Sequence, residues 1–349
     1  MKTIFPSNKW GLSFCYIQLL IALNTIFLSK LKAFVWKCTK GQLIHWRYMR
    51  TYDDRHAVKG FLSSEETIDY IIEHKCSISR YGDGEFQMIE HGLKGGDEAH
   101  FGVDTFQTFN KSLSTRLNEV LNNPINGLLI CLPYPMIDSK VYRGYERIFW
   151  EREWLWKNKL IQEALKRHSV LGDSTFTRFY MHRTDIDDYP AYIQKLKRIW
   201  DNVPIVIVEG SKSRLGVGND LFSNASDIKR IICPAVNAYA AYDQILSCIK
   251  DNGQKECIYL LALGHTATVM AADLALEGYQ ALDLGHIDIE YEWFRMGAKE
   301  KCPVKNKYVN EVQEGRITDN SIVDQQYEKE IWFRIESNKS SVKFRHDGL

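Results

Sequence analysis

The sequence predicts an α/β protein with a Rossmann-like, mostly parallel sheet that carries helices on both faces. Residues 203–208 and 257–263 are continuous apolar runs, which are typical of strands covered on both sides. After the second run, residues 264–266 open an alanine-rich helix, Gly278 ends it, and residues 281–284 resume an apolar strand pattern. This order indicates a β-α-β unit, which places its two strands parallel in one sheet.

The 349-residue chain has the composition of an ordinary globular protein, with 45% hydrophobic residues and a formal net charge of +1. This composition excludes the disordered, collagen-like and coiled-coil classes. Because 45 Lys and Arg are balanced by 44 Asp and Glu, no concentrated positive charge favours nucleic acid, and we expect no nucleic-acid partner. The eight cysteines form no C-x-x-C pair, which predicts free thiols in a reducing compartment.

Residues 1–50 form a hydrophobic and basic segment ahead of the α/β region. Residues 10–28 contain no charged side chain, and at about 1.5 Å per residue a helix of this length just crosses a hydrocarbon core of about 30 Å. More lysines follow this stretch than precede it, so the rest of the chain is expected in the cytoplasm. The stretch is interpreted as a spanning helix, a helix on the cytoplasmic surface of the inner membrane, or a first helix buried in the fold. In the first two cases it would attach the protein to the membrane.

The main domain is expected over residues 51–311, with residues 312–349 as a C-terminal extension packed on it or trailing from it. A capping box formed by Ser63 and Glu66 predicts a helix that ends near Lys75. Further elements are expected in the following order: a strand at 76–79, helices at about 85–90 and 105–122, a strand at 128–132, and helices at about 141–167 and 190–201.

Polar loops follow several of the predicted strands. They span residues 80–85, 209–220, 264–266 and 285–290. Ligands of open parallel sheets bind beyond the carboxyl ends of the strands, so we expect these loops to converge on one ligand site.

The first loop places two carboxylates, Asp83 and Glu85, on either side of Gly84. In an extended segment both side chains would face one way, and two such charges about 4 Å apart repel by about 4 kcal/mol at an effective dielectric of about 20. A bound Mg²⁺ or Mn²⁺ would relieve this repulsion and bridge to phosphate oxygens. The alternative is an exposed turn with a glutamate at a helix start.

The second loop combines charged side chains with three glycines. Its backbone N–H groups would cradle a diphosphate that Arg214 binds in bidentate fashion. The loop lacks the residue order of a Walker A motif and the third glycine of a dinucleotide fingerprint, so NAD binding is not favoured. The alternative is a glycine-rich surface loop.

The remaining loops offer an anion site and further titratable groups. Residues 264–266 stand at a helix start, where free N–H groups bind anions, although Thr266 would equally serve as a helix cap. His286, Asp288 and Glu290 alternate along an expected extended stretch, so they would share a face and supply a base or metal ligands.

Two further groups have both a functional and a structural interpretation. Arg178 follows a short apolar run and would meet a phosphate or form a surface salt bridge. Tyr142, Trp150, Trp154 and Trp156 fall in a helical stretch and would form an aromatic platform for a sugar, although this spacing is more typical of packing residues.

Four segments carry the motifs SRYGDGE (79–85), VEGSKSRLGVGNDL (208–221), ALGHTAT (262–268) and DLGHIDIEYEW (283–293). In this order, across about residues 63–311, they resemble the GT-D-fold glycosyltransferase domain family. The resemblance implies a Rossmann-like single domain, a nucleotide-sugar donor and a role in assembling bacterial surface glycans.

By this resemblance Asp83 and Glu85 are the D-x-E pair that contacts the metal ion and the donor diphosphate. His265 departs from the family pattern, which favours proline at this position. The other loop residues are expected to form the walls of the donor site: Arg80, Gly82, Gly84, Arg178, Glu209, Ser211, Arg214, Asn219, Asp220, Gly264, His265 and Thr266.

The residues and the resemblance together predict a hexosyltransferase that moves a sugar from a nucleotide sugar, such as a UDP-sugar, to a glycan acceptor in polysaccharide or glycoprotein assembly. The expected cofactor is Mn²⁺ or Mg²⁺ held by Asp83 and Glu85, and the candidate bases are His286, Asp288 and Glu290. Two alternatives stay open: a metal-dependent phosphotransferase or nucleotidyltransferase, and a non-catalytic nucleotide-sugar-binding member of a glycan-assembly complex.

Overall fold

The computed structural model describes residues 41–56, 59–97, 107–316, 324–336 and 342–344. The chain divides into two compact units, Met1–Tyr52 and Asp53–Leu349. The first unit contributes a helix over residues 41–49, and the apolar segment at 10–28 lies outside the described residues. Within the described ranges no helix is both long enough and apolar enough to cross a bilayer.

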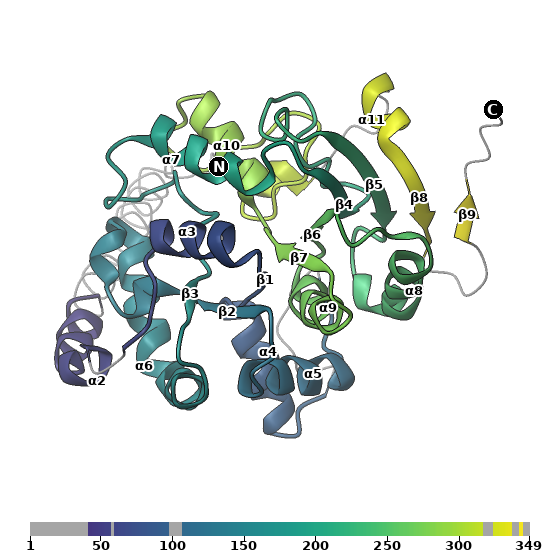
Figure 1. The fold of residues 1–349 in the computed structure, drawn as a ribbon. Helices are drawn as coiled ribbons and strands as arrows, with labels where there is room; N and C mark the ends of the chain where they lie inside the picture. Colours follow the sequence, from purple (N-terminus) through teal and green to yellow (C-terminus); the bar gives the residue numbers. More distant parts are fainter. Residues whose placement is uncertain (1–40, 57–58, 98–106, 317–323, 337–341, 345–349) are drawn as a thin grey trace, which may run out of the picture. The chain divides into compact units, whose positions relative to one another are not determined.

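Among the described residues of the second unit, nine strands form one sheet in the order β3-β2-β1-β7-β6-β4-β5-β8-β9 (Figure 1). Strands β1 to β8 run parallel, and β9 is antiparallel to β8. The prediction of an α/β fold with a mostly parallel sheet is therefore confirmed. The strands are β1 (Ser77–Arg80), β2 (Leu128–Leu132), β3 (Gly172–Asp173), β4 (Pro204–Gly210), β5 (Asp227–Cys233), β6 (Ile258–Ala262), β7 (Gln280–Asp283), β8 (Ile331–Ile335) and β9 (Val342–Phe344).

Helices connect the strands and cover the sheet. The described α-helices are α2 (Tyr52–His56), α3 (Ser64–His74), α4 (Asp83–Leu93), α5 (Lys111–Asn122), α6 (Gly144–Arg167), α7 (Tyr189–Lys197), α8 (Tyr242–Asn252), α9 (His265–Leu276), α10 (Ile287–Arg295) and α11 (Gln325–Glu330).

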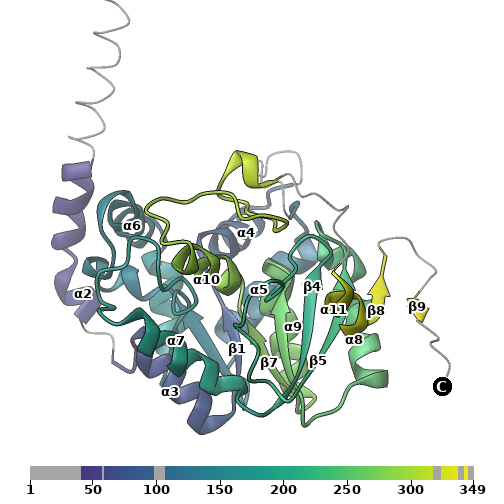
Figure 2. The ribbon, with the colours of Figure 1, turned by 90° about the horizontal axis from the view of Figure 1, so that it is seen from above.

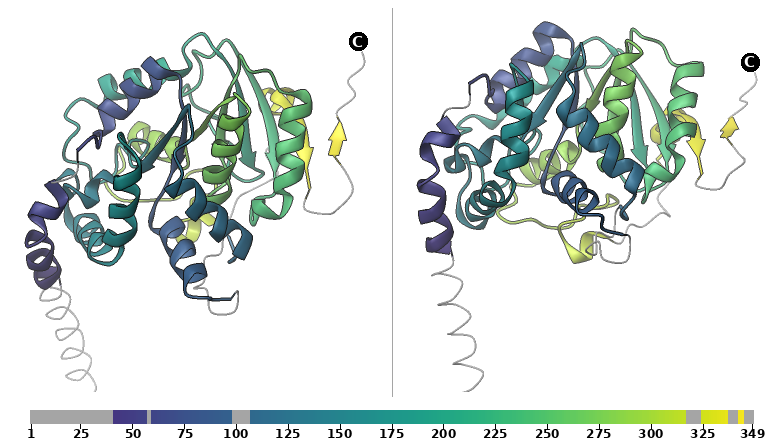
Figure 3. Two further views of the ribbon diagram at one scale, coloured as in Figure 1. Left: turned by 60° about the horizontal axis from the view of Figure 1, so that its bottom comes forward. Right: turned by 90° about the horizontal axis from the view of Figure 1, so that it is seen from below.

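The two faces of the sheet carry separate apolar cores, because successive side chains of a strand point to opposite sides. On one face Ile205 and Ile207 of β4 pack in a core with side chains of α3, α7 and α10. On the other face Val206 and Val208 pack with α8 and α9. Figures 2 and 3 show these two helical layers on opposite sides of the strands. Burial on both faces explains why the run at 203–208 is apolar without alternation.

Several local predictions are confirmed. The Ser63 side chain accepts a hydrogen bond from the Glu66 N–H, the Glu66 carboxylate accepts one from the Ser63 N–H at 2.8 Å, and Lys75 ends α3 in a left-handed conformation. The predicted strands at 128–132, 203–208, 257–263 and 281–284 correspond to β2, β4, β6 and β7.

Other elements differ from the prediction. Strand β5 has no apolar signal in its first half, and its Arg230 is accommodated by ion pairs at 2.7 Å with Glu209 of β4 and Glu330 of α11. The helix expected over 105–122 begins at Lys111, because the Asn110 side chain caps it there, and residues 98–106 lie outside the described ones. Within the expected C-terminal extension, α11 leads into β8, which extends the sheet beside β5.

Candidate active site

A cavity of about 520 Å³ lies at the carboxyl ends of β1, β4, β6 and β7. Each of the four predicted loops, 80–85, 209–220, 264–266 and 285–290, contributes residues to its wall. The loop after β3 and the start of α6 also line it, as do residues 308, 310 and 311. The expected convergence of the loops is therefore found in the structure.

Asp83 and Glu85 line this cavity from the first turn of α4, so the helix expected from about residue 85 is present but begins at Asp83, and the pair does not lie in an extended segment. Gly82 is the N-cap residue of α4, and the Glu85 carboxylate accepts a hydrogen bond from its N–H at 2.8 Å. A helix start favours carboxylates because its free N–H groups carry positive partial charge. Burial and the neighbouring Glu85 nevertheless raise the pKa of Asp83 above its ordinary value, against the opposing effects of Arg178 and His265.

Two carboxylates fit a hard divalent cation, but a bound ligand must supply the rest of its coordination shell. The pKa of Asp83 is raised first by burial and then by the neighbouring Glu85 charge, so a bound cation would favour the charged form of this carboxyl. Among the described residues, no group of three or more His, Cys, Asp or Glu side chains is arranged to hold a metal ion. Mg²⁺ and Mn²⁺ commonly take one or two protein carboxylates and complete their shell with substrate phosphates and water. Asp83 and Glu85 match that donor set.

His265 faces the same pair from the start of α9. Its Nε2 lies 3.9 Å from Glu85 Oε1, and neither ring nitrogen has a hydrogen-bond partner among the described residues, although the residue is only 6% exposed. A Cβ atom on Gly84 would lie 2.7 Å from His265 Nε2, so glycine is what allows this close approach. Gly264 also lines the cavity, whereas Thr266 is fully buried and lies outside its wall.

Arg80 is held in place at the carboxyl end of β1. Its guanidinium donates to the Asp283 backbone oxygen at 2.6 Å, to the Asp283 carboxylate at 3.1 Å and to Thr177 Oγ1 at 2.7 Å. A Cβ atom on Gly285 would lie 1.9 Å from this guanidinium. Arg80 therefore lines the cavity and ties together the loops that follow β1, β3 and β7.

Arg178, His286 and Glu311 form a charged cluster in the cavity wall. One Glu311 oxygen lies 2.9 Å from Arg178 Nη1, and the other lies 3.1 Å from His286 Nε2. Burial disfavours the charged form of Glu311, but His286 and Arg178 outweigh it and hold the pKa of Glu311 well below its ordinary value. Arg178 thus forms a salt bridge, as one of its two interpretations expected. Because this salt bridge lies in the cavity wall, it is compatible with the other interpretation, contact with a phosphate. Sequence analysis missed Glu311, since it stands in a polar stretch without a strand or motif signal.

The residues after β7 are helical, so the expected extended stretch was wrong, but His286, Asp288 and Glu290 all line the cavity. Asp288 accepts hydrogen bonds from the Gly216 N–H at 3.0 Å and from Asn219 Nδ2 at 2.7 Å. It also forms an ion pair with Lys307 at 2.6 Å, so both of its carboxylate oxygens have partners within the protein.

Glu290 has a different environment. One carboxylate oxygen accepts hydrogen bonds from the Tyr180 and Met181 N–H groups, both at 2.9 Å. Burial raises the pKa of Glu290, and Arg178 and the two N–H groups reduce this effect without cancelling it. The side chain lines the cavity, where a raised pKa suits a group that exchanges a proton.

The glycine-rich loop after β4 contacts the cavity through residues other than those expected. Ser213 and Leu215 line the cavity, whereas the predicted Glu209, Ser211, Arg214, Asn219 and Asp220 do not.

The physical reason is that this loop folds back onto the protein. Glu209 accepts a hydrogen bond from the Leu215 N–H at 2.6 Å and pairs with Arg230. The Arg214 guanidinium lies over the Tyr327 ring, 4.8 Å from its centroid. Asp220 accepts a hydrogen bond from the Tyr291 hydroxyl at 2.6 Å.

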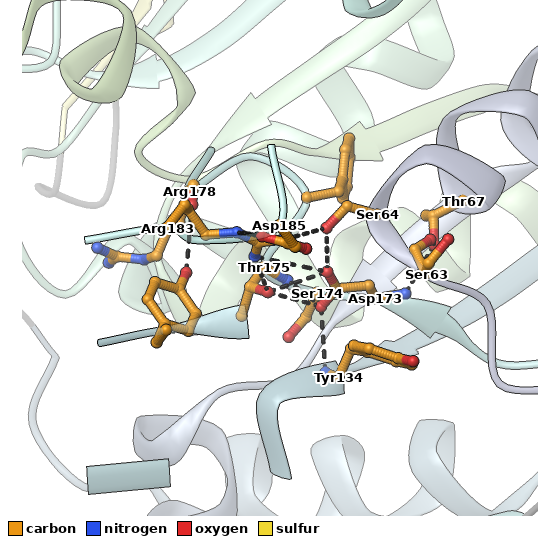
Figure 4. A network of polar contacts seen from close by, with 12 residues as sticks. Ser63, Ser64, Thr67, Tyr134, Asp173, Ser174, Thr175, Arg178, Arg183 and Asp185 are labelled. Carbon is orange, nitrogen blue, oxygen red and sulfur yellow. Dashed lines mark hydrogen bonds and ion pairs between the residues drawn. The ribbon is translucent and has the colours of Figure 1, made fainter. Parts of the chain in front are cut away.

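Figure 4 shows the buried network that holds the loop carrying Arg178. The Asp173 carboxylate accepts hydrogen bonds from the Tyr134 N–H at 3.1 Å, the Thr175 N–H at 2.8 Å, the Thr175 hydroxyl at 2.7 Å and the Ser64 hydroxyl. Because Arg178 follows Thr175 by three positions, this network fixes where Arg178 enters the cavity wall.

The fold and this cavity define an α/β protein of Rossmann-like architecture whose ligand site lies beyond the carboxyl ends of its parallel strands. The sequence model of the glycosyltransferase GT-D fold family matches residues 78–312, and the chain belongs to this family.

Curated relatives and solved structures agree with this assignment. The chain is similar to a probable glycosyl transferase Gly of Streptococcus gordonii, with 39% identity over 72% of this chain and 35% of the relative. It is also similar to the glycosyltransferase GlyD of Streptococcus pneumoniae, with 36% identity over 73% of this chain and 30% of the relative. The chain thus spans about a third of the length of these relatives.

Two solved structures resemble the fold closely. One is described as a highly conserved domain of unknown function 1792 with a distinct glycosyltransferase fold; it is 35% identical, has a TM-score of 0.71 and matches 83% of this chain and 100% of its own. The other, described as a new glycosyltransferase from Streptococcus sanguinis, is 34% identical with a TM-score of 0.63 and matches 78% of this chain and 97% of its own.

Proposed function

We propose that the protein transfers a hexose from a nucleotide-sugar donor, such as a UDP-sugar, to a glycan acceptor. The observation that carries this proposal is that two acidic side chains, Asp83 and Glu85, line the same cavity of a glycosyltransferase fold as Arg178 and His286. Cleavage of a sugar diphosphate leaves negative charge on the departing nucleotide. Cationic side chains aimed at that charge stabilise the transition state.

We propose that Asp83 and Glu85 hold Mn²⁺ or Mg²⁺ together with the donor diphosphate. The bound metal would act as a Lewis acid toward the diphosphate oxygens. Support comes from the position of both carboxylates in the cavity wall and from the Glu85 charge, whose repulsion contributes to the raised pKa of Asp83 and would be relieved by a cation. The Glu85 carboxylate is oriented by the Gly82 N–H, which donates to it at 2.8 Å, and His265 Nε2 lies 3.9 Å from its other oxygen.

Glu290 is the favoured base among the three predicted candidates if the acceptor hydroxyl must be deprotonated. Asp288 is engaged by Lys307 and Asn219, and His286 is paired with Glu311. Glu290 lines the cavity, and the raised pKa of its carboxyl, caused by burial, lets it take up a proton more readily than an ordinary glutamate.

The biological setting is part of the proposal. Both curated relatives are streptococcal glycosyltransferases, which supports a role in assembling bacterial surface polysaccharide or glycoprotein. Contact of residues 10–28 with the cytoplasmic face of the inner membrane stays a prediction, as does a location in the cytoplasm.

The test measures turnover of a panel of nucleotide sugars and nucleoside triphosphates, with Mn²⁺, with Mg²⁺ and with a chelator. We expect metal-dependent turnover of nucleotide sugars, and Asp83→Asn should reduce it by about 10² to 10³-fold, as loss of a charge-stabilising contact typically does. The matched control is Asp69→Asn, because Asp69 is an exposed acid of α3 outside the cavity. Near wild-type turnover by Asp83→Asn would contradict the site. Turnover of triphosphates alone would favour the phosphotransferase or nucleotidyltransferase alternative, and no turnover with either class would favour the non-catalytic binding protein.

A further inference from the structure

An aromatic wall formed by Tyr142, Tyr145, Phe149 and Trp150 lines the cavity at the start of α6. The platform expected from the sequence contained a different set of rings. Trp154 is fully buried, and Trp156 is exposed but does not line the cavity. The structure thus replaces these two tryptophans with Tyr145 and Phe149.

Tyr145 and Phe149 form the open part of the wall. They stand four residues apart, which places them on the same side of the helix, and their ring centroids are 6.4 Å apart with an interplanar angle of 39°. Tyr145 is 62% exposed, whereas Trp150 is only 8% exposed. Phe149 is half-buried: it packs edge-on against Trp150 at 5.0 Å, and the Arg152 guanidinium lies 4.9 Å from its ring centroid, so the exposed Tyr145 ring rests on a packed base.

The deeper end of the wall is anchored to the charged part of the site. The Tyr142 hydroxyl donates to the Arg178 backbone oxygen at 3.2 Å, and the Arg183 guanidinium lies 5.0 Å from the Tyr142 ring centroid. The aromatic wall therefore adjoins the loop that presents Arg178.

Two charged side chains complete the surface beside the rings. Glu146 lies between Tyr145 and Phe149 in the sequence, and its carboxylate is 3.4 Å from Lys301 Nζ and 3.7 Å from His182 Nε2. Glu146 and Lys301 both line the cavity. Rings that offer an apolar face, flanked by a carboxylate and an ammonium group, suit a sugar, which combines apolar C–H faces with hydroxyl groups.

We infer that this wall binds the acceptor saccharide, with a sugar ring stacked on Tyr145 and Phe149 and its hydroxyls bonded to Glu146 and Lys301. The inference rests on the proposed function. The wall suits the acceptor rather than the donor because the groups that match a diphosphate and its metal, Arg178 and the Asp83–Glu85 pair, lie on other elements of the cavity.

The experiment uses the full chain and separates acceptor from donor. Binding of a panel of p-nitrophenyl glycosides and free disaccharides is followed by saturation-transfer NMR, and UDP binding is followed by calorimetry. With any glycoside that is turned over, the Michaelis constants for acceptor and donor are measured separately. We expect Tyr145→Ala and Phe149→Ala each to raise the acceptor KM about tenfold, in line with stacking interactions of this size, and more than the donor KM.

Matched variants report whether the ring itself matters. Trp46→Ala removes a ring that is 54% exposed and outside the cavity wall, so it should leave both constants unchanged. Tyr145→Phe keeps the ring and should keep most of the acceptor affinity. Because Tyr145 is largely exposed, its removal should not change the unfolding temperature.

The proposal is overturned if no saccharide of the panel shows saturation transfer that Tyr145→Ala weakens, or if the variants weaken UDP binding as much as saccharide binding. The latter result would assign the wall to the donor nucleotide. Failure of the proposed function would show instead as absence of nucleotide-sugar turnover by the wild-type chain, which saccharide binding does not depend on.

Discussion

Replacing Asp173 tests the reasoning about the buried network behind the cavity. Its carboxylate is fully buried and accepts hydrogen bonds from the Tyr134 and Thr175 N–H groups and from the Ser64 and Thr175 hydroxyls. It also lies 4.0 Å from the Arg183 guanidinium, which keeps a second carboxylate, Asp185, at 2.6 Å.

Asp173→Ala removes every one of these acceptors at once. Each buried donor left without a partner costs about 1–3 kcal/mol, and the hydroxyls can turn toward other acceptors more easily than the two backbone N–H groups can. We therefore expect a loss of about 3–5 kcal/mol, which is a large part of the 5–15 kcal/mol of stability that is typical of a domain. Asp173→Asn keeps one oxygen for the two N–H groups and should cost about half as much.

The assay is urea unfolding followed by circular dichroism, with Asp69→Ala as the control. Asp69 forms an exposed salt bridge with Lys195, so its removal should change the free energy of unfolding by less than about 1 kcal/mol. If Asp173→Ala unfolded within about 0.5 kcal/mol of the wild type, or if the Asn and Ala variants were equally stable, hydrogen-bond acceptance by Asp173 would not be what holds this loop.

Two further changes have defined outcomes. Because Glu311 has a depressed pKa in the folded state, its contribution to stability is present above the ordinary pKa of 4.5 and is lost as the pH falls through the lower folded value. Glu311→Gln should therefore be less stable than the wild type by about 2 kcal/mol at pH 6, and denaturant titrations should show this difference shrinking below pH 4. A difference in stability that does not depend on pH would refute the ionic origin. A Cβ atom on Gly172 would lie 2.6 Å from Cys131 Sγ and 2.9 Å from Leu129 Cδ2. Gly172→Ala should thus destabilise the protein by about 1–3 kcal/mol, and adding Cys131→Ala should restore part of this loss in a double-mutant cycle. If the stability losses of the two single variants simply added up in the double variant, the predicted clash would be excluded.

The sequence predicted the central strands because their environment leaves a clear pattern. Strands β4 and β6 are covered on both faces, so their residues are continuously apolar and bounded by polar loops. The first half of strand β5 carries Arg230, whose burial depends on ion pairs with residues of β4 and α11, and no local pattern records such tertiary pairing.

The same distinction explains the site. The convergence of the loops follows from the geometry of parallel strands, so it was predictable. The helical state of residues 83–85 was not, because acids at alternate positions suit a helix start as well as an extended turn. Contacts such as Arg214 over Tyr327, or Glu311 with His286, join segments distant in sequence and could only be found in the structure.

The ion pair of Lys307 with Asp288 has a consequence for any excised form of this protein. It fastens the stretch that delivers Glu311 onto α10, although that stretch adds no strand to the sheet. A fragment ending at Arg295 would keep the strands β1 to β7 yet lose the counter-charge of Arg178 and His286. Removing this stretch would therefore change the charge of the cavity wall even though every strand from β1 to β7 is kept.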